Sequence, residues 1–151
     1  MSTIHASAVL VGAKAALIRG PAGAGKSQLV WQLLDAAAQG ARFGALPFAR
    51  LVADDRAHVE MCGGRLVVRP APELAGLLEM RGLGIRRLPY EPMAVVGLVV
   101  DLAATDAERC PGVEAKKANI DGVILPRLAV APGQPALALV LAYLGTVPTA
   151  N

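Results

Sequence analysis

Residues 20–27 are Gly20-Pro21-Ala22-Gly23-Ala24-Gly25-Lys26-Ser27 and match the pattern G-x-x-x-x-G-K-S/T. The glycines let successive backbone N–H groups turn inward around phosphate oxygens, because no Cβ stands in the way. Lys26 has the length to reach the outer phosphates, and the Ser27 hydroxyl is a suitable Mg²⁺ ligand. The stretch predicts a phosphate-binding loop. The simpler alternative is a glycine-rich turn that caps a helix through Ser27.

The segments beside the loop supply the context that such a loop requires. Ala15–Arg19 and Ser7–Val11 are short apolar runs that predict two strands joined by a turn. Apolar residues at helical spacing predict a helix from Lys26 to Gln39, and Gly40 provides a stop. The N-terminal N–H groups and the dipole of this helix would favour an anion.

The rest of the chain predicts strands with interspersed helices and several hairpins. Gly63-Gly64 predicts a β-hairpin between His58–Met61 and Arg65–Val68. Further strands are predicted at Leu51–Ala53, Val95–Leu102, Val123–Leu125 and Leu128–Val130, a short helix near Glu73, and a helix or strand at Pro135–Leu144. Leu78–Ile85 has no clear assignment, and residues 105–122 resemble a loop or a frayed helix. The expected fold class is α/β with a mixed sheet.

Composition limits the class of protein. With 151 residues, 54% of them hydrophobic, the chain is sized for one domain spanning residues 1–151. Its longest apolar runs, Met93–Val100 and Pro135–Gly145, are too short to cross a bilayer. The N-terminus lacks the positive flank of a signal peptide, so we expect a cytoplasmic protein with no membrane contact. Cys62 and Cys110 are predicted to be reduced, buried thiols.

The net charge of +3 does not indicate a nucleic-acid partner. The basic residues are scattered, and the chain has only 2 Phe, 2 Tyr and 1 Trp to stack on bases. A phosphorylated or acidic ligand accounts equally well for the small positive excess.

An acidic pair follows the next predicted strand. Leu51-Val52-Ala53 ends in Asp54 and Asp55. Proteins with phosphate loops usually hold their metal with an acid at the end of a neighbouring strand, and adjacent acids point in different directions. One could face Mg²⁺ and the other could take the proton of a hydroxyl acceptor. Taken alone, the pair could equally be a capping or turn-forming feature.

Three stretches resemble the HPr kinase/phosphorylase family. They are the segment that begins with His5 (Ile4–Val11), the phosphate loop with Leu51–Arg56 (LVADDR), and Leu78–Ile85 (LEMRGLGI), which is similar to the family signature LEIRGLGI except at Met80. The resemblance runs from about Ile4 to Ala142. It implies a P-loop kinase core that resembles phosphoenolpyruvate carboxykinase.

The resemblance also implies a function and roles for single residues. The family uses ATP and Mg²⁺ to phosphorylate a seryl hydroxyl of HPr, a small phosphocarrier protein, and forms a homo-oligomer, a hexamer. By motif, the residues of Gly20–Ser27 would bind ATP, and the metal ligands would be Ser27, Glu79 and Asp54. Asp55 would accept the proton, with Asp54 as its partner, and His5 and Lys26 would lie at the catalytic centre. Arg109 would match the later catalytic arginine.

Two departures from the family pattern limit the activity that we expect. An N-terminal domain found in the family has no counterpart in these 151 residues, and Ala131–Gln134 lacks the basic residues of the segment used for the reverse, phosphorylase reaction. The sequence thus predicts a kinase without phosphorylase activity. Two alternatives remain open: a kinase of a small hydroxyl metabolite, and a nucleotide-sensing module without catalysis.

Overall fold

The described part of the chain, residues 1–40, 46 and 48–149 of the computed structural model, is built mainly from β-strands. The strands are β1 (Ser2–Ile4), β2 (Ala6–Val11), β3 (Lys14–Arg19), β4 (Ala49–Ala53), β5 (Ala57–Cys62), β6 (Arg65–Pro70), β7 (Leu77–Met80), β8 (Gly84–Arg87), β9 (Ala94–Asp101), β10 (Lys117–Ile120) and β11 (Val123–Ala129). The helices are α1 (Lys26–Ala38) and α2 (Ala136–Gly145), with 3₁₀ turns at Pro72–Leu74 and Glu114–Lys116.

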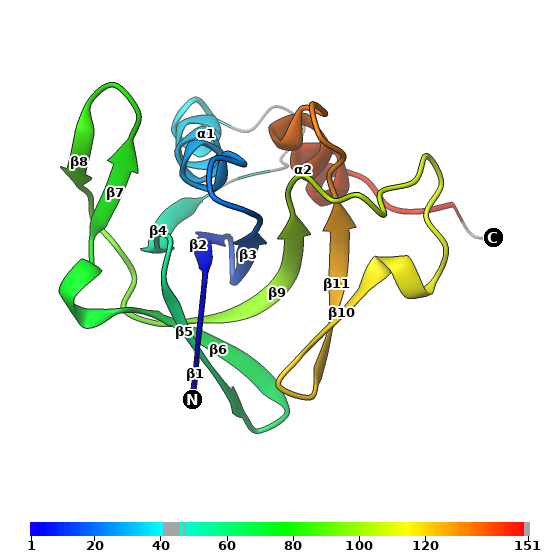
Figure 1. Ribbon diagram of the computed structural model, residues 1–151, viewed down its shortest axis with the longest axis horizontal. Helices are drawn as coiled ribbons and strands as arrows, with labels where there is room; N and C mark the ends of the chain where they lie inside the picture. Colours follow the sequence, from blue (N-terminus) through cyan, green and yellow to red (C-terminus); the bar gives the residue numbers. More distant parts are fainter. Residues whose placement is uncertain (41–45, 47, 150–151) are drawn as a thin grey trace.

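Nine of these strands form one sheet in the order β1-β5-β6-β9-β3-β2-β4, with β11 also on β9 and β10 on β11. Only β3 with β9 and β9 with β11 run parallel among the paired strands. The long strand β9 curves through the centre of the molecule, and β7 and β8 form a separate hairpin to one side (Figure 1).

The expected fold class, an α/β P-loop kinase core resembling phosphoenolpyruvate carboxykinase, is wrong. The protein is mostly β, with a curled, half-barrel sheet that is mixed but mainly antiparallel, and with two α-helices in the described residues. The physical reason lies in the connections. β2–β3, β5–β6 and β10–β11 are antiparallel neighbours joined by two residues, too few for the crossover helices that build an α/β core.

A bulge at Gly97 helps to curl the sheet. Ala15 pairs with Val96 of β9 but Ala16 pairs with Leu98, so Gly97 is an extra residue in its strand. A Cβ at this position would lie 2.8 Å from the Cβ of Lys14. The first half of β9 pairs with β6 and the second half with β3 and β11, so the strand turns from one part of the sheet to the other here.

Two hydrophobic clusters cover the two faces of the sheet. Along β3, Ala15 and Leu17 lie in one cluster, and Ala16 and Ile18 lie in the other, as the two-residue period of a strand requires. The second cluster includes Leu29, Val30 and Leu33 of α1 and Val140 of α2. Both helices therefore pack on the same face (Figure 1).

Several local predictions are confirmed. The hairpins β2–β3 and β5–β6, the helix α1, and the strands β4 and β9 lie within a few residues of the expected ranges. Pro135–Leu144, for which the sequence predicts a helix or a strand, is the helix α2. The unassigned Leu78–Ile85 lies in the hairpin β7–β8, and the two strands expected after Val123 are the single strand β11.

The prediction of buried cysteines is wrong, because Cys62 and Cys110 are both exposed free thiols. Within the described residues, no helix has the length and apolar character needed to span a membrane.

Candidate active site

The phosphate loop leads directly into α1. Gly23 and Gly25 have φ angles of 82° and 99°, the left-handed region that suits glycine. Gly20 passes close to Leu102, whose carbonyl oxygen would lie 3.3 Å from a Cβ added at Gly20. The Lys26 side chain is buried in the loop, with Nζ donating to the carbonyls of Gly20 at 2.9 Å and Pro21 at 3.3 Å. An ammonium group is thus held at the centre of the loop.

Two neighbouring stretches of chain, β1–β2 and β4–β5, are interrupted at the same place beside this loop. β1 and β2 are separated by His5, and β4 and β5 by Asp54–Arg56. The pairs Ile4–Ala57 and Ala8–Ala53 share one register, which places Ser7 opposite Asp54. The acidic pair therefore lies where the strands bend, with backbone groups free to bind side chains.

Asp54 is a buried carboxylate with three donors. Ser7 and Ser27 donate hydroxyl hydrogen bonds to Oδ1 at 2.8 and 2.7 Å, and the backbone N–H of Glu79 donates to Oδ2 at 3.2 Å. Ser7 is fully buried and also accepts a hydrogen bond from the backbone N–H of Asp55 at 3.1 Å. The network links the phosphate loop, both aspartates and β7.

Asp55 occupies an unusual backbone conformation. Its φ is 65°, and the N–H of Arg56 donates to the carbonyl of Asp54 across it at 2.7 Å, which closes a tight turn. The turn directs the Asp55 carboxylate away from Asp54. This exposed carboxylate meets His5, with Nε2 and Oδ1 2.5 Å apart.

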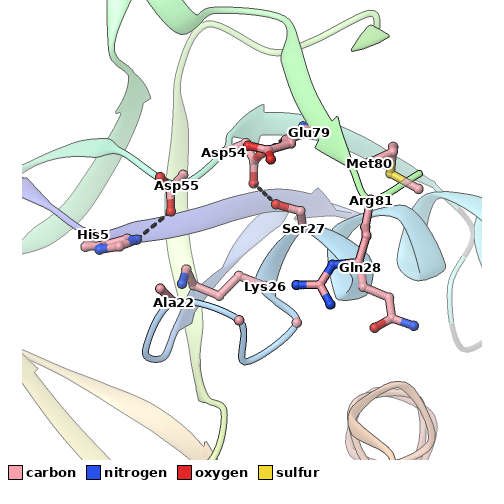
Figure 2. A pocket seen from close by; sticks show the side chains of 12 residues that line it. His5, Ala22, Lys26, Ser27, Gln28, Asp54, Asp55, Glu79, Met80 and Arg81 are labelled. Atoms are coloured by element: carbon pink, nitrogen blue, oxygen red, sulfur yellow. Dashed lines mark hydrogen bonds and ion pairs between the residues drawn. The ribbon is translucent and has the colours of Figure 1, made fainter. Parts of the chain in front are cut away.

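These groups surround one pocket of about 600 Å³. It is lined by His5, Ala22, Gly23, Gly25, Lys26, Ser27, Gln28, Asp54, Asp55, Glu79, Met80 and Arg81. Figure 2 shows Lys26 below the two aspartates and Arg81 extending across the pocket toward Gln28. Cationic groups from the loop and from β7–β8 thus flank the acidic groups.

A second charged network anchors the start of the phosphate loop. Arg19, which precedes Gly20, donates two hydrogen bonds to the Asp101 carboxylate, at 2.7 and 2.8 Å. Arg127 also donates to Asp101 and makes two bonds to Asp106. Burial alone would raise the pKa of Asp101, but the two arginines outweigh it and lower that pKa. Arg127 likewise lowers the pKa of Asp106, and its own pKa is raised by these carboxylates.

The structure brings most of the sequence-predicted site residues together. His5, Lys26, Ser27, Asp54, Asp55 and Glu79 line the pocket with Ala22, Gly23 and Gly25, and Gly20, Pro21 and Ala24 complete the same loop. Arg109 lines a different pocket, between residues 107–116, β11 and α2.

The sequence motifs give no site role to Ser7 or to Gln28. The pattern predicts Ser7 only as the first residue of a strand, although a lone hydroxyl between Ala6 and Ala8 in a buried strand is a signal for a polar partner. Gln28 follows the loop motif but belongs to none of its positions, so the motif gave no reason to single it out.

Comparisons with known proteins give one informative result. No family model and no curated protein matches this chain. Among solved structures, it is similar to the Hpr(Ser) kinase/phosphatase from Coxiella burnetii, with a TM-score of 0.72 and 21% sequence identity. The match covers 93% of this chain and 92% of that chain. At this identity the similarity establishes a common architecture, and the chain therefore has the fold of the Hpr(Ser) kinase/phosphatase.

Proposed function

We propose that this chain, acting as a single domain of residues 1–151, is an ATP- and Mg²⁺-dependent kinase that phosphorylates a seryl hydroxyl of an HPr-type phosphocarrier protein. One observation carries the proposal: the phosphate loop and the exposed carboxylate of Asp55 line the same pocket, with Asp54 bonded to Ser27 between them. The fold shared with the Hpr(Ser) kinase/phosphatase supports the choice of acceptor.

The loop and the start of α1 bind the nucleotide. The phosphates are bound by N–H groups of the loop and of the first turn of α1, as at other helix N-termini that follow a glycine-rich loop. Within the loop, Pro21 has no N–H and the N–H of Ala24 donates to the carbonyl of Pro21. Lys26 exchanges its two loop carbonyls for phosphate oxygens. Because phosphate oxygens are negatively charged, this exchange strengthens the hydrogen bonds of the ammonium group.

The oxygen atoms of the site fit a magnesium ion. Ser27 Oγ and Asp54 Oδ1 lie 2.7 Å apart, and Glu79 lines the same pocket. The described residues contain no cluster of three His, Cys, Asp or Glu side chains that would cage a metal. Mg²⁺ usually takes one or two protein oxygens, phosphate and water, so this set is sufficient. Mg²⁺ supplies neutralisation of phosphate charge.

Asp55 acts on the acceptor. Its exposed carboxylate accepts the proton of the seryl hydroxyl as the hydroxyl oxygen bonds to the γ-phosphorus and the bond to ADP breaks. His5 holds the carboxylate through its hydrogen bond. The reverse phosphorylase reaction is not part of the proposal, because Ala131–Gln134 carries no basic residue.

The setting proposed for this reaction is the cytoplasm, where the carrier is the protein partner and the enzyme works as a homo-oligomer. The family resemblance of the motifs supports these points. Arg109 lies in the other pocket and is left without a role in the mechanism.

The test is direct. Purified protein is incubated with ATP, Mg²⁺ and an HPr-type carrier from the same source, and the intact mass of the carrier is followed. One added phosphate on a carrier serine with the parent, and none with the matched Asp55→Asn variant, is the expected result. An unmodified carrier despite ATP binding would contradict the proposal. Phosphorylation of a small alcohol would then favour a metabolite kinase. ATP binding without any turnover would favour a nucleotide sensor.

A further inference from the structure

The hairpin β7–β8 projects from the body of the protein at the edge of the candidate active site (Figure 1). Among the described strands β8 pairs only with β7, and all four residues of β8 are exposed. A strand with one buried face would alternate buried and exposed residues. The hairpin therefore presents a surface that the rest of the described chain does not cover.

This surface combines apolar and cationic side chains. Leu83 at the tip is 64% exposed and Ile85 is 67% exposed. Arg86 and Arg87 follow Ile85 on β8 and are exposed, Arg87 on the same face as Ile85 and Arg86 on the opposite face. Neither arginine makes a salt bridge to another described residue. We call these four residues the hairpin surface. Exposed apolar residues beside unpaired positive charge fit a partner that is apolar at its centre and acidic at its border.

The register of the hairpin connects its surface to the pocket. Glu79 pairs with Ile85 across the two strands, so both side chains lie on one face, whereas the buried Leu78 faces the core with the α1 cluster. Glu79, Met80 and Arg81 line the phosphate pocket. A molecule that reaches Asp55 from this side therefore passes over Ile85.

We propose that the hairpin surface is the docking site for the acceptor protein, which presents an apolar patch bordered by acidic side chains next to the hydroxyl to be phosphorylated. The proposal rests on the proposed function and adds where the partner binds. The hairpin binds the body of the acceptor, and the pocket receives only its hydroxyl. Specificity for a protein acceptor over a small alcohol follows from this division.

The test uses the full chain and two double variants, Leu83→Ser with Ile85→Ser and Arg86→Glu with Arg87→Glu. The matched controls are Ile124→Ser and Arg65→Glu, which change exposed residues on β11 and β6. Transfer is followed with the HPr-type carrier, and binding of the carrier is measured by calorimetry with a non-hydrolysable ATP analogue. Nucleotide affinity and molar mass are measured for every variant.

We expect both double variants to raise the carrier KM and Kd by about tenfold or more, as for residues at the centre of an interface, with nucleotide affinity unchanged. Added salt should weaken carrier binding by the parent more than by the arginine variant. An unchanged carrier Kd would overturn the proposal. So would a parallel loss of nucleotide affinity, which would make the hairpin part of the nucleotide site, or a change in molar mass, which would assign the surface to a second copy of this chain.

The two proposals fail in different ways. A parent that binds the carrier through the hairpin but transfers no phosphate contradicts the kinase function and supports the docking surface. A parent that transfers phosphate with variants equal to it supports the kinase and contradicts the docking surface. A parent that does not bind the carrier contradicts the docking surface whatever its activity toward other acceptors.

Discussion

The buried hydroxyl of Ser7 donates a hydrogen bond to Oδ1 of Asp54 over 2.8 Å. The same oxygen of Ser7 accepts the backbone N–H of Asp55 at 3.1 Å. One side chain on β2 therefore fixes both members of the acidic pair, from the opposite strand of the bend. This arrangement makes Ser7 a positioning residue for the site, although it does not line the pocket.

Replacing Ser7 with alanine should damage both stability and transfer. The variant leaves the N–H of Asp55 without its acceptor and removes one of three donors to Asp54, which should lower the free energy of unfolding by about 1–3 kcal/mol. We expect kcat for phosphate transfer to fall more than ATP affinity, since the loop is untouched. Urea unfolding and steady-state kinetics measure the two effects.

Thr105→Ala is the control for this prediction, because Thr105 is an exposed hydroxyl far along the chain. It should change stability by less than about 0.5 kcal/mol. Equal kcat in Ser7→Ala and in the parent would show that the aspartates do not depend on Ser7.

Much of the local structure followed from the sequence, because local signals decide it. Gly63-Gly64 predicts the β5–β6 hairpin, and both glycines have positive φ, as a tight turn requires. The periodicity of Leu29, Val30 and Leu33 predicts α1 and its buried face. The motif Gly20–Ser27 predicts the loop in front of that helix.

The fold class could not be predicted from local sequence signals. The curl of the sheet depends on the Gly97 bulge and on β9 changing partners along its length, both of which are pairings between distant segments. The lining of the candidate site could be predicted where a motif names the residue, as for Lys26 and Asp55. The meeting of His5 with Asp55 depends instead on two strands that bend at the same place, 50 residues apart in the sequence.

Substitutions at Asp55 should separate backbone strain from chemistry. Asparagine tolerates the left-handed conformation well, so Asp55→Asn should unfold at the same urea concentration as the parent, to within about 0.5 kcal/mol. A β-branched residue is poorly suited to a φ of 65°, and Asp55→Val should cost about 1–2 kcal/mol. Both variants should lose phosphate transfer by roughly a hundredfold or more if Asp55 is the base. Equal stability of the valine and asparagine variants would contradict the strained turn.

Lys26→Met tests whether the buried lysine, which donates to two loop carbonyls, also binds the phosphates of ATP. Methionine keeps most of the side-chain volume but cannot donate to the carbonyls of Gly20 and Pro21. We expect the loss of a charged donor to reduce ATP affinity by about ten- to a hundredfold, or about 1.4–2.8 kcal/mol. Calorimetric titration with ATP measures it. Arg81→Met is the comparison, since Arg81 lies in the same pocket outside the loop. If Lys26→Met binds ATP as tightly as the parent, Lys26 is excluded from the phosphate site.

The Asp101 network predicts how stability depends on pH. Because Arg19 and Arg127 lower the pKa of Asp101 in the folded protein, this carboxylate stabilises the fold above its unfolded pKa, near 3.8, and the contribution is lost as pH falls through the lower folded value. Asp101→Asn should lower the free energy of unfolding by about 2–3 kcal/mol at pH 7.

The difference between Asp101→Asn and the parent should shrink as pH falls below the unfolded pKa, near 3.8, and should be lost once the folded carboxylate is protonated at its lower pKa. Asp35→Asn, which changes an exposed carboxylate on α1, should stay within about 0.5 kcal/mol of the parent at every pH. Urea unfolding between pH 7 and pH 2.5 gives the three curves. A gap between the parent and Asp101→Asn that stays constant across this range would contradict a stabilisation by the charge of Asp101, because the asparagine variant has no such charge to lose on acidification.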